Sequence, residues 1–240
     1  MVPFWRGMVM NDLTSIHNQL SFMVLPYLAI LLFFLVGIYR YSARRFSYSS
    51  LSSQFLENQQ HFWGLVPFHY GILVVLLGHL MAFLIPQQIL LWNSHPLRLI
   101  ILEISALIFG LLSIIGLLTA VARRLTNSRV KYVTSVTDWI LLLLLLFQVL
   151  SGVYIAIFIP WGSSWFAASM TPYLRSLLQL NPNINYITGL PFMVKYHIIN
   201  AFILIGFAPF TRLVHVLVMP TPYLWRKPQV VRWYQNRKLV

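Results

Sequence analysis

The chain has 240 residues, of which 59% are apolar and only 9% are charged. An ordinary soluble domain has roughly 25% charged residues, so this composition excludes a water-soluble globule. The net charge of +13 does not indicate a nucleic-acid-binding protein, because the Lys and Arg residues lie in short clusters between long apolar runs. The absence of cysteine excludes disulfides, thiolate-bound iron–sulfur clusters and covalently attached c-type haem, which leaves the seven histidines as the strong metal ligands.

Five apolar windows are long enough to cross a membrane, which takes about 20 residues in a helix. The sequence therefore predicts an all-α integral membrane protein, a bundle of five transmembrane helices that forms one domain over residues 1–240. Two segments rich in small and polar residues, 42–60 and 171–192, are predicted as surface loops. The predicted helices cover residues 22–39, 66–85, 99–122, 139–160 and 196–219, and a tail follows over 220–240.

Lys and Arg residues are distributed unevenly between the two sides of this predicted bundle, thirteen against four. The cytoplasmic side of a bacterial membrane carries the excess of basic residues. We therefore expect a multi-pass protein of the cytoplasmic (inner) membrane with its N-terminus outside and its C-terminus in the cytoplasm. The thirteen are Arg40, Arg44, Arg45, Arg123, Arg124, Arg129, Lys131, Arg212, Arg226, Lys227, Arg232, Arg237 and Lys238, and the four are Arg6, Arg98, Arg175 and Lys195.

Four histidines lie inside predicted spans, His69 and His79 in the second and His197 and His215 in the fifth. An ionisable side chain within a bilayer is energetically costly and by default marks a functional site. Because the two helices run in opposite directions, His69 and His215 fall in the cytoplasmic half, and His79 and His197 fall in the outer half. Facing imidazoles from two helices are typical ligands of an electron-transferring haem, so the pattern predicts two bis-histidine haem sites.

The spacing of these histidines predicts a mismatch in height. Ten residues from His69 to His79 give a helical rise of ~15 Å, whereas eighteen from His197 to His215 give ~27 Å and place both on one face of a continuous helix. Tilted helices and macrocycles standing along the membrane normal would absorb the difference. Two alternatives stay open: each histidine only donates a hydrogen bond to a nearby carbonyl, or the four bind zinc, which their separation disfavours. The other histidines, His17, His61 and His95, are expected to be ordinary interfacial residues.

Four segments resemble, in order, the gamma (haem b) subunit of membrane-bound respiratory nitrate reductases: GIYRYSARRFSYSSLSSQ, VPFHYGILVVLLGH, ARRLTNSRVKYVTSVTD and FAPFTRLVHVLVMPTPYLWR. The likeness runs from about Tyr39 to Val230, and the ten- and eighteen-residue histidine gaps are specific to that family. The resemblance implies two noncovalent b haems, one on the cytoplasmic side held by His69 and His215 and an outer one held by His79 and His197. It also implies that quinol is oxidised near the outer haem. Electrons would then pass to an iron–sulfur beta subunit and a molybdenum-containing alpha subunit on the cytoplasmic side.

The resemblance further points to a quinol site. Gly78 matches a family glycine beside that site, where the missing side chain opens a path for a flat ring; close helix packing is the alternative reading. A family lysine in the outer loop is not matched, since Leu99 stands there, and the adjacent Arg98 becomes the candidate. Glu103 is expected either to accept a quinol proton or, as we favour, to pair with a neighbouring polar group.

Two arginines are candidate partners of the haem propionates. Arg124 matches a family position at the cytoplasmic end of the third span, and Arg212 lies three residues before His215. A guanidinium fork suits a carboxylate, although topology alone would also place arginines there.

Taken together, these features predict the electron-transfer subunit of a quinol-dependent nitrate reductase complex. One rival is the haem b anchor of another quinone-linked enzyme, such as a formate dehydrogenase or a hydrogenase. A rival of a different class is a haem-free membrane anchor or a transporter, although the inverted repeat typical of many transporters is absent from the sequence.

Overall fold

The computed structural model describes residues 14–43 and 59–216, and every regular element in these ranges is helical. Five of its helices are long and apolar enough to cross a membrane, which confirms the five predicted spans. Most of the predicted 42–60 loop and the predicted 220–240 tail lie outside the described residues. The five spans are Thr14–Ala43, Trp63–Leu84, Pro96–Thr126, Val136–Phe158 and Phe192–Phe210.

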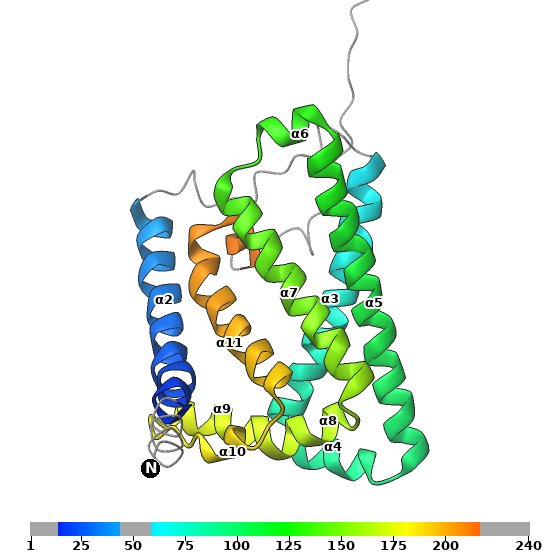
Figure 1. Ribbon diagram of the computed structural model, residues 1–240, viewed down its shortest axis with the longest axis vertical. Coiled ribbons are helices and arrows are strands. Elements are labelled where there is room, and N and C mark those ends of the chain that lie inside the picture. The colour runs from blue at the N-terminus through cyan, green and yellow to red at the C-terminus, as the bar shows by residue number, and fades with distance from the viewer. Residues whose placement is uncertain (1–13, 44–58, 217–240) are drawn as a thin grey trace, which may run out of the picture.

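The spans pack in a chain of neighbours (Figure 1). Helix α3 (Gln59–Leu84) packs on α5 (Pro96–Thr126), and α5 packs on α7 (Val136–Phe158). Helix α7 in turn packs on α11 (Phe192–Phe207), and α11 packs on α2 (Leu25–Ala43). Helices α3 and α11, which are expected to carry the histidine pairs, each pack mainly on other helices and not on each other within the described residues.

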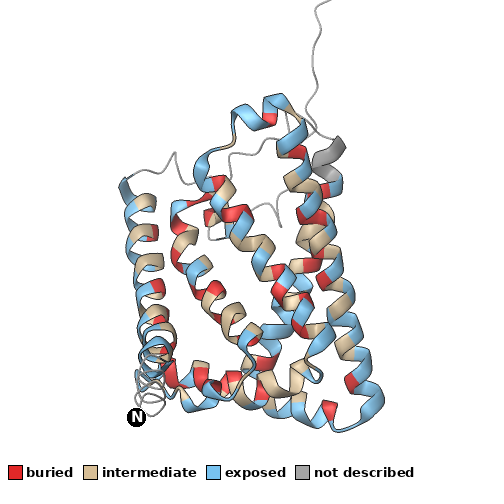
Figure 2. Cartoon of the chain, viewed as in Figure 1, coloured by how far each residue is buried: buried red, intermediate tan, exposed pale blue. Residues whose placement is uncertain are grey.

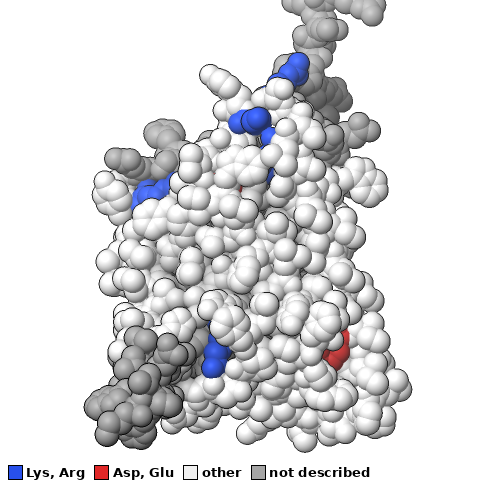
Figure 3. All heavy atoms as spheres, viewed as in Figure 1, with Lys and Arg blue, Asp and Glu red and all other residues white. Residues whose placement is uncertain are grey.

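Much of each span is exposed (Figure 2), and many of the exposed residues are large and apolar. On α2, for example, Leu31, Phe34 and Ile38 are each more than half exposed. On the face drawn in Figure 3 the charged side chains lie near the two ends, and the band between them is uncharged. An apolar, uncharged waist of this kind is what a lipid-facing surface requires, because a charge at mid-membrane depth is costly.

Glycines set the close approach of α3 and α5. A Cβ atom built on Gly71 would lie 2.6 Å from the carbonyl oxygen of Phe109, and one built on Gly116 would lie 2.6 Å from that of Gly64. Both distances are shorter than any real carbon contact, so this approach requires glycine at both positions. The α3–α5 pair thus forms a tight seam, and it fixes the height of His69, which is two residues from Gly71.

Short helices close one end of the bundle, which we call the α9 end (Figure 1). Within the predicted loop 171–192, Tyr173 and Ile187 are fully buried. The expectation of a surface loop there is therefore wrong, because the apolar side of residues 171–180 (TPYLRSLLQL) packs inward. The elements at this end are α4 (Pro86–Asn93), α8 (Gly162–Trp165), η3 (Phe166–Met170), α9 (Thr171–Leu178) and α10 (Asn185–Thr188).

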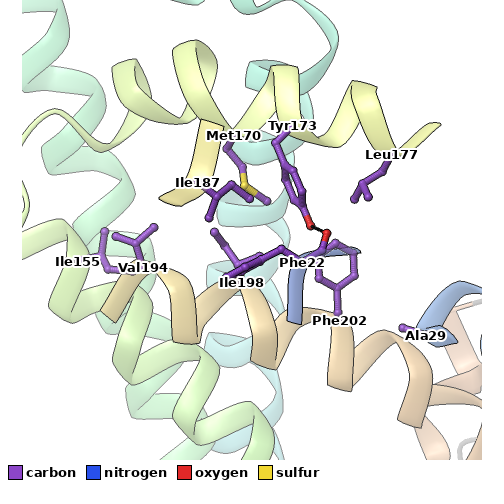
Figure 4. Close-up of a cluster of buried hydrophobic side chains, with 10 residues drawn as sticks. All are labelled: Phe22, Ala29, Ile155, Met170, Tyr173, Leu177, Ile187, Val194, Ile198 and Phe202. Atoms are coloured by element: carbon purple, nitrogen blue, oxygen red, sulfur yellow. Dashed lines mark hydrogen bonds between the residues drawn. The ribbon is translucent and has the colours of Figure 1, made fainter. Parts of the chain in front are cut away.

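A buried cluster joins the α9 end to the spans (Figure 4). The Tyr173 hydroxyl donates to the carbonyl of Phe22 at 2.7 Å, and the Tyr27 hydroxyl donates to the carbonyl of Leu177 at 3.0 Å. Burial, with a smaller contribution from Tyr27, raises the pKa of Tyr173, so its phenol stays neutral and remains a donor. The cluster comprises Phe22, Ala29, Ile155, Met170, Tyr173, Leu177, Ile187, Val194, Ile198 and Phe202.

The fifth span differs from the predicted continuous helix over 196–219. Helix α11 ends at Phe207 and is followed by two 3₁₀ segments, η4 (Ala208–Phe210) and η5 (Arg212–Val216). Pro209 has no amide hydrogen to donate, and Thr211 has extended backbone angles of φ −119° and ψ −174°. Regular helical hydrogen bonding is therefore interrupted between Pro209 and Thr211.

This break changes the geometry of the two histidines of the fifth span. His197 lies in α11 and His215 lies in η5, so they do not share one face of a single helix, as the spacing predicted. The carbonyls released by the break are satisfied from α2, because the Arg40 guanidinium donates to the carbonyls of Pro209 and Thr211.

Candidate functional site

The imidazoles of His69 and His215 lie close together, with ring centroids 6.2 Å apart and planes inclined by 57°. Two imidazoles bound to opposite sides of one iron have ring centres about 6 Å apart, since each metal–nitrogen bond is ~2.0 Å and each ring centre lies ~1 Å beyond its nitrogen. Within the described ranges, no three His, Asp or Glu side chains come together as a metal site. A pair of imidazoles needs a macrocycle to complete the coordination of a metal, and the observed separation fits a bis-histidine haem site.

The hydrogen bonds of this pair leave the correct nitrogen available to a metal. Nδ1 of His69 lies 2.8 Å from the carbonyl oxygen of Leu65, and Nδ1 of His215 lies 2.7 Å from that of Arg212. Since a carbonyl can only accept, each Nδ1 carries the proton, and each Nε2 keeps the lone pair that binds a metal. A purely structural histidine would make the same carbonyl bond, so it is the 6.2 Å separation of the two rings that favours the metal site.

The second predicted pair, His79 and His197, is placed differently. Nδ1 of His79 donates to the carbonyl of Val75 at 2.8 Å, and its ring packs edge-on against Phe166 at 5.0 Å. His197 is near enough to His79 to interact electrostatically. However, its Nε2 lies 3.0 Å from the side-chain amide nitrogen of Gln148 on α7. Both residues are imidazoles, as an outer haem would need, but ligation would require the Gln148 amide to leave Nε2 of His197, so this pair stays a prediction.

Sequence reasoning missed the residues of α7 that contact His197. The hydroxyl of Ser151 lies 2.8 Å from Nδ1 of His197, and a Cβ atom on Gly152 would lie 3.1 Å from Cε1 of the same ring. The available signal was the placement of Gln148 and Ser151 three residues apart in the otherwise apolar run LLLLLLFQVLSGVY. Polar residues at that spacing share one helix face and need a partner inside the membrane.

The two candidate propionate arginines gather around a carboxylate that the sequence analysis did not single out. The Nε atom of Arg212 lies 3.0 Å from Oδ1 of Asp138, and Arg212 also donates to the carbonyl of Val133 at 3.0 Å. Arg124 donates to the carbonyl of Ala120 at 3.1 Å and lies within electrostatic range of Asp138 and Arg212. A propionate role for both arginines stays a prediction.

Asp138 was recognisable from its position at the start of a span. Its carboxylate accepts from the backbone N–H of Ser135 at 2.9 Å, and the Ser135 hydroxyl accepts from the N–H of Asp138 at 3.2 Å. This capping box begins α7. Asp138 therefore stabilises the N-terminus of α7 and also forms an ion pair with Arg212, which is three residues before His215.

The candidate quinol residues lie toward the α9 end. A Cβ atom on Gly78 would find no atom within 4 Å, which goes against the packing reading of this glycine. The exposed Arg98 places its guanidinium 5.3 Å from the centre of the Trp92 ring. Glu103 accepts from the backbone N–H of Ser163 at 2.8 Å and from its hydroxyl at 2.6 Å. The pairing role favoured for Glu103 is thus the one observed.

Comparison with known proteins gives one consistent result. A family model described as the nitrate reductase gamma subunit matches residues 18–234. The chain is 33% identical over 220 residues to the nitrate reductase gamma chain of Bacillus subtilis (strain 168), covering 90% of this chain and 98% of that protein. It is 30% identical over 222 residues to the respiratory nitrate reductase 2 gamma chain of Escherichia coli (strain K12), covering 90% and 96%. Identity to the respiratory nitrate reductase 1 gamma chain of the same organism is 27% over 221 residues, covering 90% and 97%.

Proposed function

The chain belongs to the family of nitrate reductase gamma subunits, and from this premise we propose that it carries electrons from a membrane quinol through two b haems to its partner subunits. The observation that carries the proposal is the 6.2 Å separation of the His69 and His215 rings, with both Nδ1 protons donated to backbone carbonyls. When bound, each haem supplies a one-electron carrier inside the membrane. The family membership favours this reading over the haem b anchor of a formate dehydrogenase or hydrogenase and over a haem-free transporter.

The packing of the helices supports a site between α3 and α11. Two helices that both ligate one macrocycle must stand apart, because the macrocycle lies between them. Helix α3 packs mainly on α5, while α11 packs mainly on α7 and α2. We assign His69 and His215 to the haem on the cytoplasmic side, called the inner haem, and His79 and His197 to the outer haem. Arg124 and Arg212 are available to the propionates of the inner haem. They lie at the end of the bundle that carries α6 (Ser128–Tyr132), which we call the α6 end.

The divergence of α3 and α5 supports a quinol site at Gly78. Three glycines of α3, Gly64, Gly71 and Gly78, recur every seven residues, so they lie near one face of the helix. The first two meet α5 closely, at Gly116 and Phe109, whereas the third meets no atom within 4 Å. The open space at Gly78 adjoins His79, and continuing the helix register places it level with residues 102–106 of α5.

This space would receive the flat ring of the quinol. His79 stands beside it as a ligand of the outer haem, so that electron transfer from the quinol takes place over a short distance. Arg98 lies at the same end of α5 as residues 102–106 and is the candidate donor to a quinone oxygen.

The basic residues at the α6 end support the proposed orientation in the membrane. Arg123, Arg129 and Lys131 lie there, as does Arg212. The excess of basic residues at one end supports a cytoplasmic position for it in the cytoplasmic (inner) membrane. The iron–sulfur beta subunit and the molybdenum-containing alpha subunit would dock on that side, and the quinol would be oxidised at the α9 end, outside.

A spectroscopic experiment on the purified chain tests this function. In haem-replete preparations, addition of a quinol analogue is expected to produce the absorption band of reduced b-type haem. Replacing Gly78 with Phe should lower the rate of that reduction by at least about tenfold with both haems still bound, because a bulky ring displaces the quinol from its reactive position.

The matched control is Leu76→Phe, which adds the same ring at an exposed position about 200° around α3 from Gly78. This variant should be reduced at the wild-type rate. A Gly78→Phe variant that is reduced as fast as wild type would remove Gly78 from the quinol site. A haem-replete chain without any b-type band would contradict the proposed function as a whole.

A further inference from the structure

His197 is held differently from the other three histidines of the spans. Nδ1 of His69, His79 and His215 bonds in each case to a backbone carbonyl three or four residues earlier in the chain. Nδ1 of His197 bonds instead to a side chain of a neighbouring helix, the hydroxyl of Ser151 on α7. A side-chain acceptor can be exchanged by mutation, whereas a carbonyl cannot.

The network around His197 fixes which nitrogen carries the proton. The Ser151 hydroxyl donates to the carbonyl of Gln148 at 3.0 Å, so its oxygen accepts from Nδ1 of His197 at 2.8 Å. Asn200 donates to the side-chain oxygen of Gln148 at 2.7 Å, which turns the amide nitrogen of Gln148 toward Nε2 of His197. The imidazole therefore has its proton on Nδ1 and its lone pair on Nε2, the form that a metal ligand needs.

Three residues of α7 share this contact, and we name them the α7 cradle: Gln148, Ser151 and Gly152. Their spacing of three and four residues puts them on one face of the helix. The 3.1 Å distance from a Cβ on Gly152 to Cε1 of His197 shows that the ring lies directly against the α7 backbone. Ser151 is only 3% exposed, and Asn200 is 5% exposed, so water does not compete for these hydrogen bonds.

We propose that Ser151 is a positioning residue for the outer haem, which orients His197 and sets the strength with which its Nε2 donates to iron. The inference rests on the proposed function, because it presumes that His197 ligates a haem. An oxygen that accepts the Nδ1 proton raises the basicity of the ligating nitrogen, and a more basic ligand favours the oxidised metal. The Gln148 amide opposes ligation, since the amide and the metal would use the same lone pair of Nε2.

A matched pair of variants isolates the hydroxyl. Ser151→Thr and Ser151→Val add nearly the same volume, but only Thr keeps an oxygen acceptor for Nδ1. In a redox titration of the holoprotein, Val should increase the ratio of reduced to oxidised outer haem about threefold to tenfold at a fixed ambient potential. A tenfold change is about 59 mV for a one-electron couple. Thr should titrate like wild type, and the inner haem should titrate alike in all three proteins.

The outcomes separate this inference from the proposed function. Equal potentials of the outer haem in the Thr and Val variants would overturn it. Loss of the outer haem from Val alone would support it, because the hydroxyl would then be needed to present the ligand. If both variants lost that haem, Ser151→Ala would be compared with wild type: a raised potential or loss of the outer haem would support the inference, and an unshifted potential would overturn it. A wild-type chain that binds no haem would refute the proposed function itself.

Discussion

Replacing His69 or His215 with Ala is expected to remove one of the two b haems and to abolish electron delivery to the partner subunits. Each iron needs both of its imidazoles, so either substitution alone empties the inner site. The outer haem should remain and should still be reduced by a quinol analogue, because neither His79 in α3 nor His197 in α11 is changed. Quinol-dependent nitrate reduction by the assembled complex should fall at least about a hundredfold, since losing an obligatory component of a unit removes most of its activity.

The measurement combines haem content per chain with two activity assays, one driven by quinol and one driven by an artificial donor that reduces the partner subunits directly. Only the first activity should be lost. His95→Ala is the control, because His95 is an exposed residue at the start of α5 and lies apart from both pairs. If His215→Ala retained two haems per chain, His215 would not be an axial ligand.

Replacing Gly116 with Ala is expected to open the α3–α5 seam. The added methyl group would lie 2.6 Å from the carbonyl oxygen of Gly64, and backbone atoms cannot move aside as a flexible side chain does. Overpacking of this kind costs about 1–3 kcal/mol and occasionally more. Since Phe68 also lies against this position, the displacement reaches the neighbouring His69, and haem affinity at the inner site should fall with stability.

Thermal unfolding in detergent, followed by haem absorbance, measures both effects. Gly189→Ala provides the comparison, because a Cβ atom at Gly189 meets no atom within 4 Å and its φ of −81° suits any residue. That variant should unfold at the wild-type temperature. A Gly116→Ala protein as stable as wild type would show that the seam tolerates a methyl group, contrary to the packing described here.

The five spans were predictable because a membrane imposes length and composition on any helix that crosses it. The four intramembrane histidines were predictable for the same reason, since each is an expensive exception in an apolar run. The break after Phe207 was only partly visible. Pro209 marked the end of α11, but the Arg40 side chain that satisfies the freed carbonyls comes from α2, which is far away in the sequence. Local sequence does not reveal such a partner.

The α9 end and the α7 cradle were not predicted, for different reasons. Residues 171–192 contain Pro, Asn and Gly and resemble a surface loop, yet Tyr173 and Ile187 are buried because the spans present an apolar surface to them. Ser151 and Gln148 interact with His197, and this contact depends on how α7 and α11 pack. The sequence shows that two polar residues share a helix face, but it does not show which helix faces them.

The central claim is that the four histidines form two pairs, each bridging α3 and the fifth span. The most direct test is the haem content and reduced-minus-oxidised spectrum of three holoproteins: His79→Ala, His197→Ala and the double variant. Each single variant should lose the same outer haem, the double variant should lose nothing more, and the inner haem should persist in all three, because the first substitution already empties the outer site. Loss of different haem signals from His79→Ala and His197→Ala would contradict the pairing and the electron path built on it.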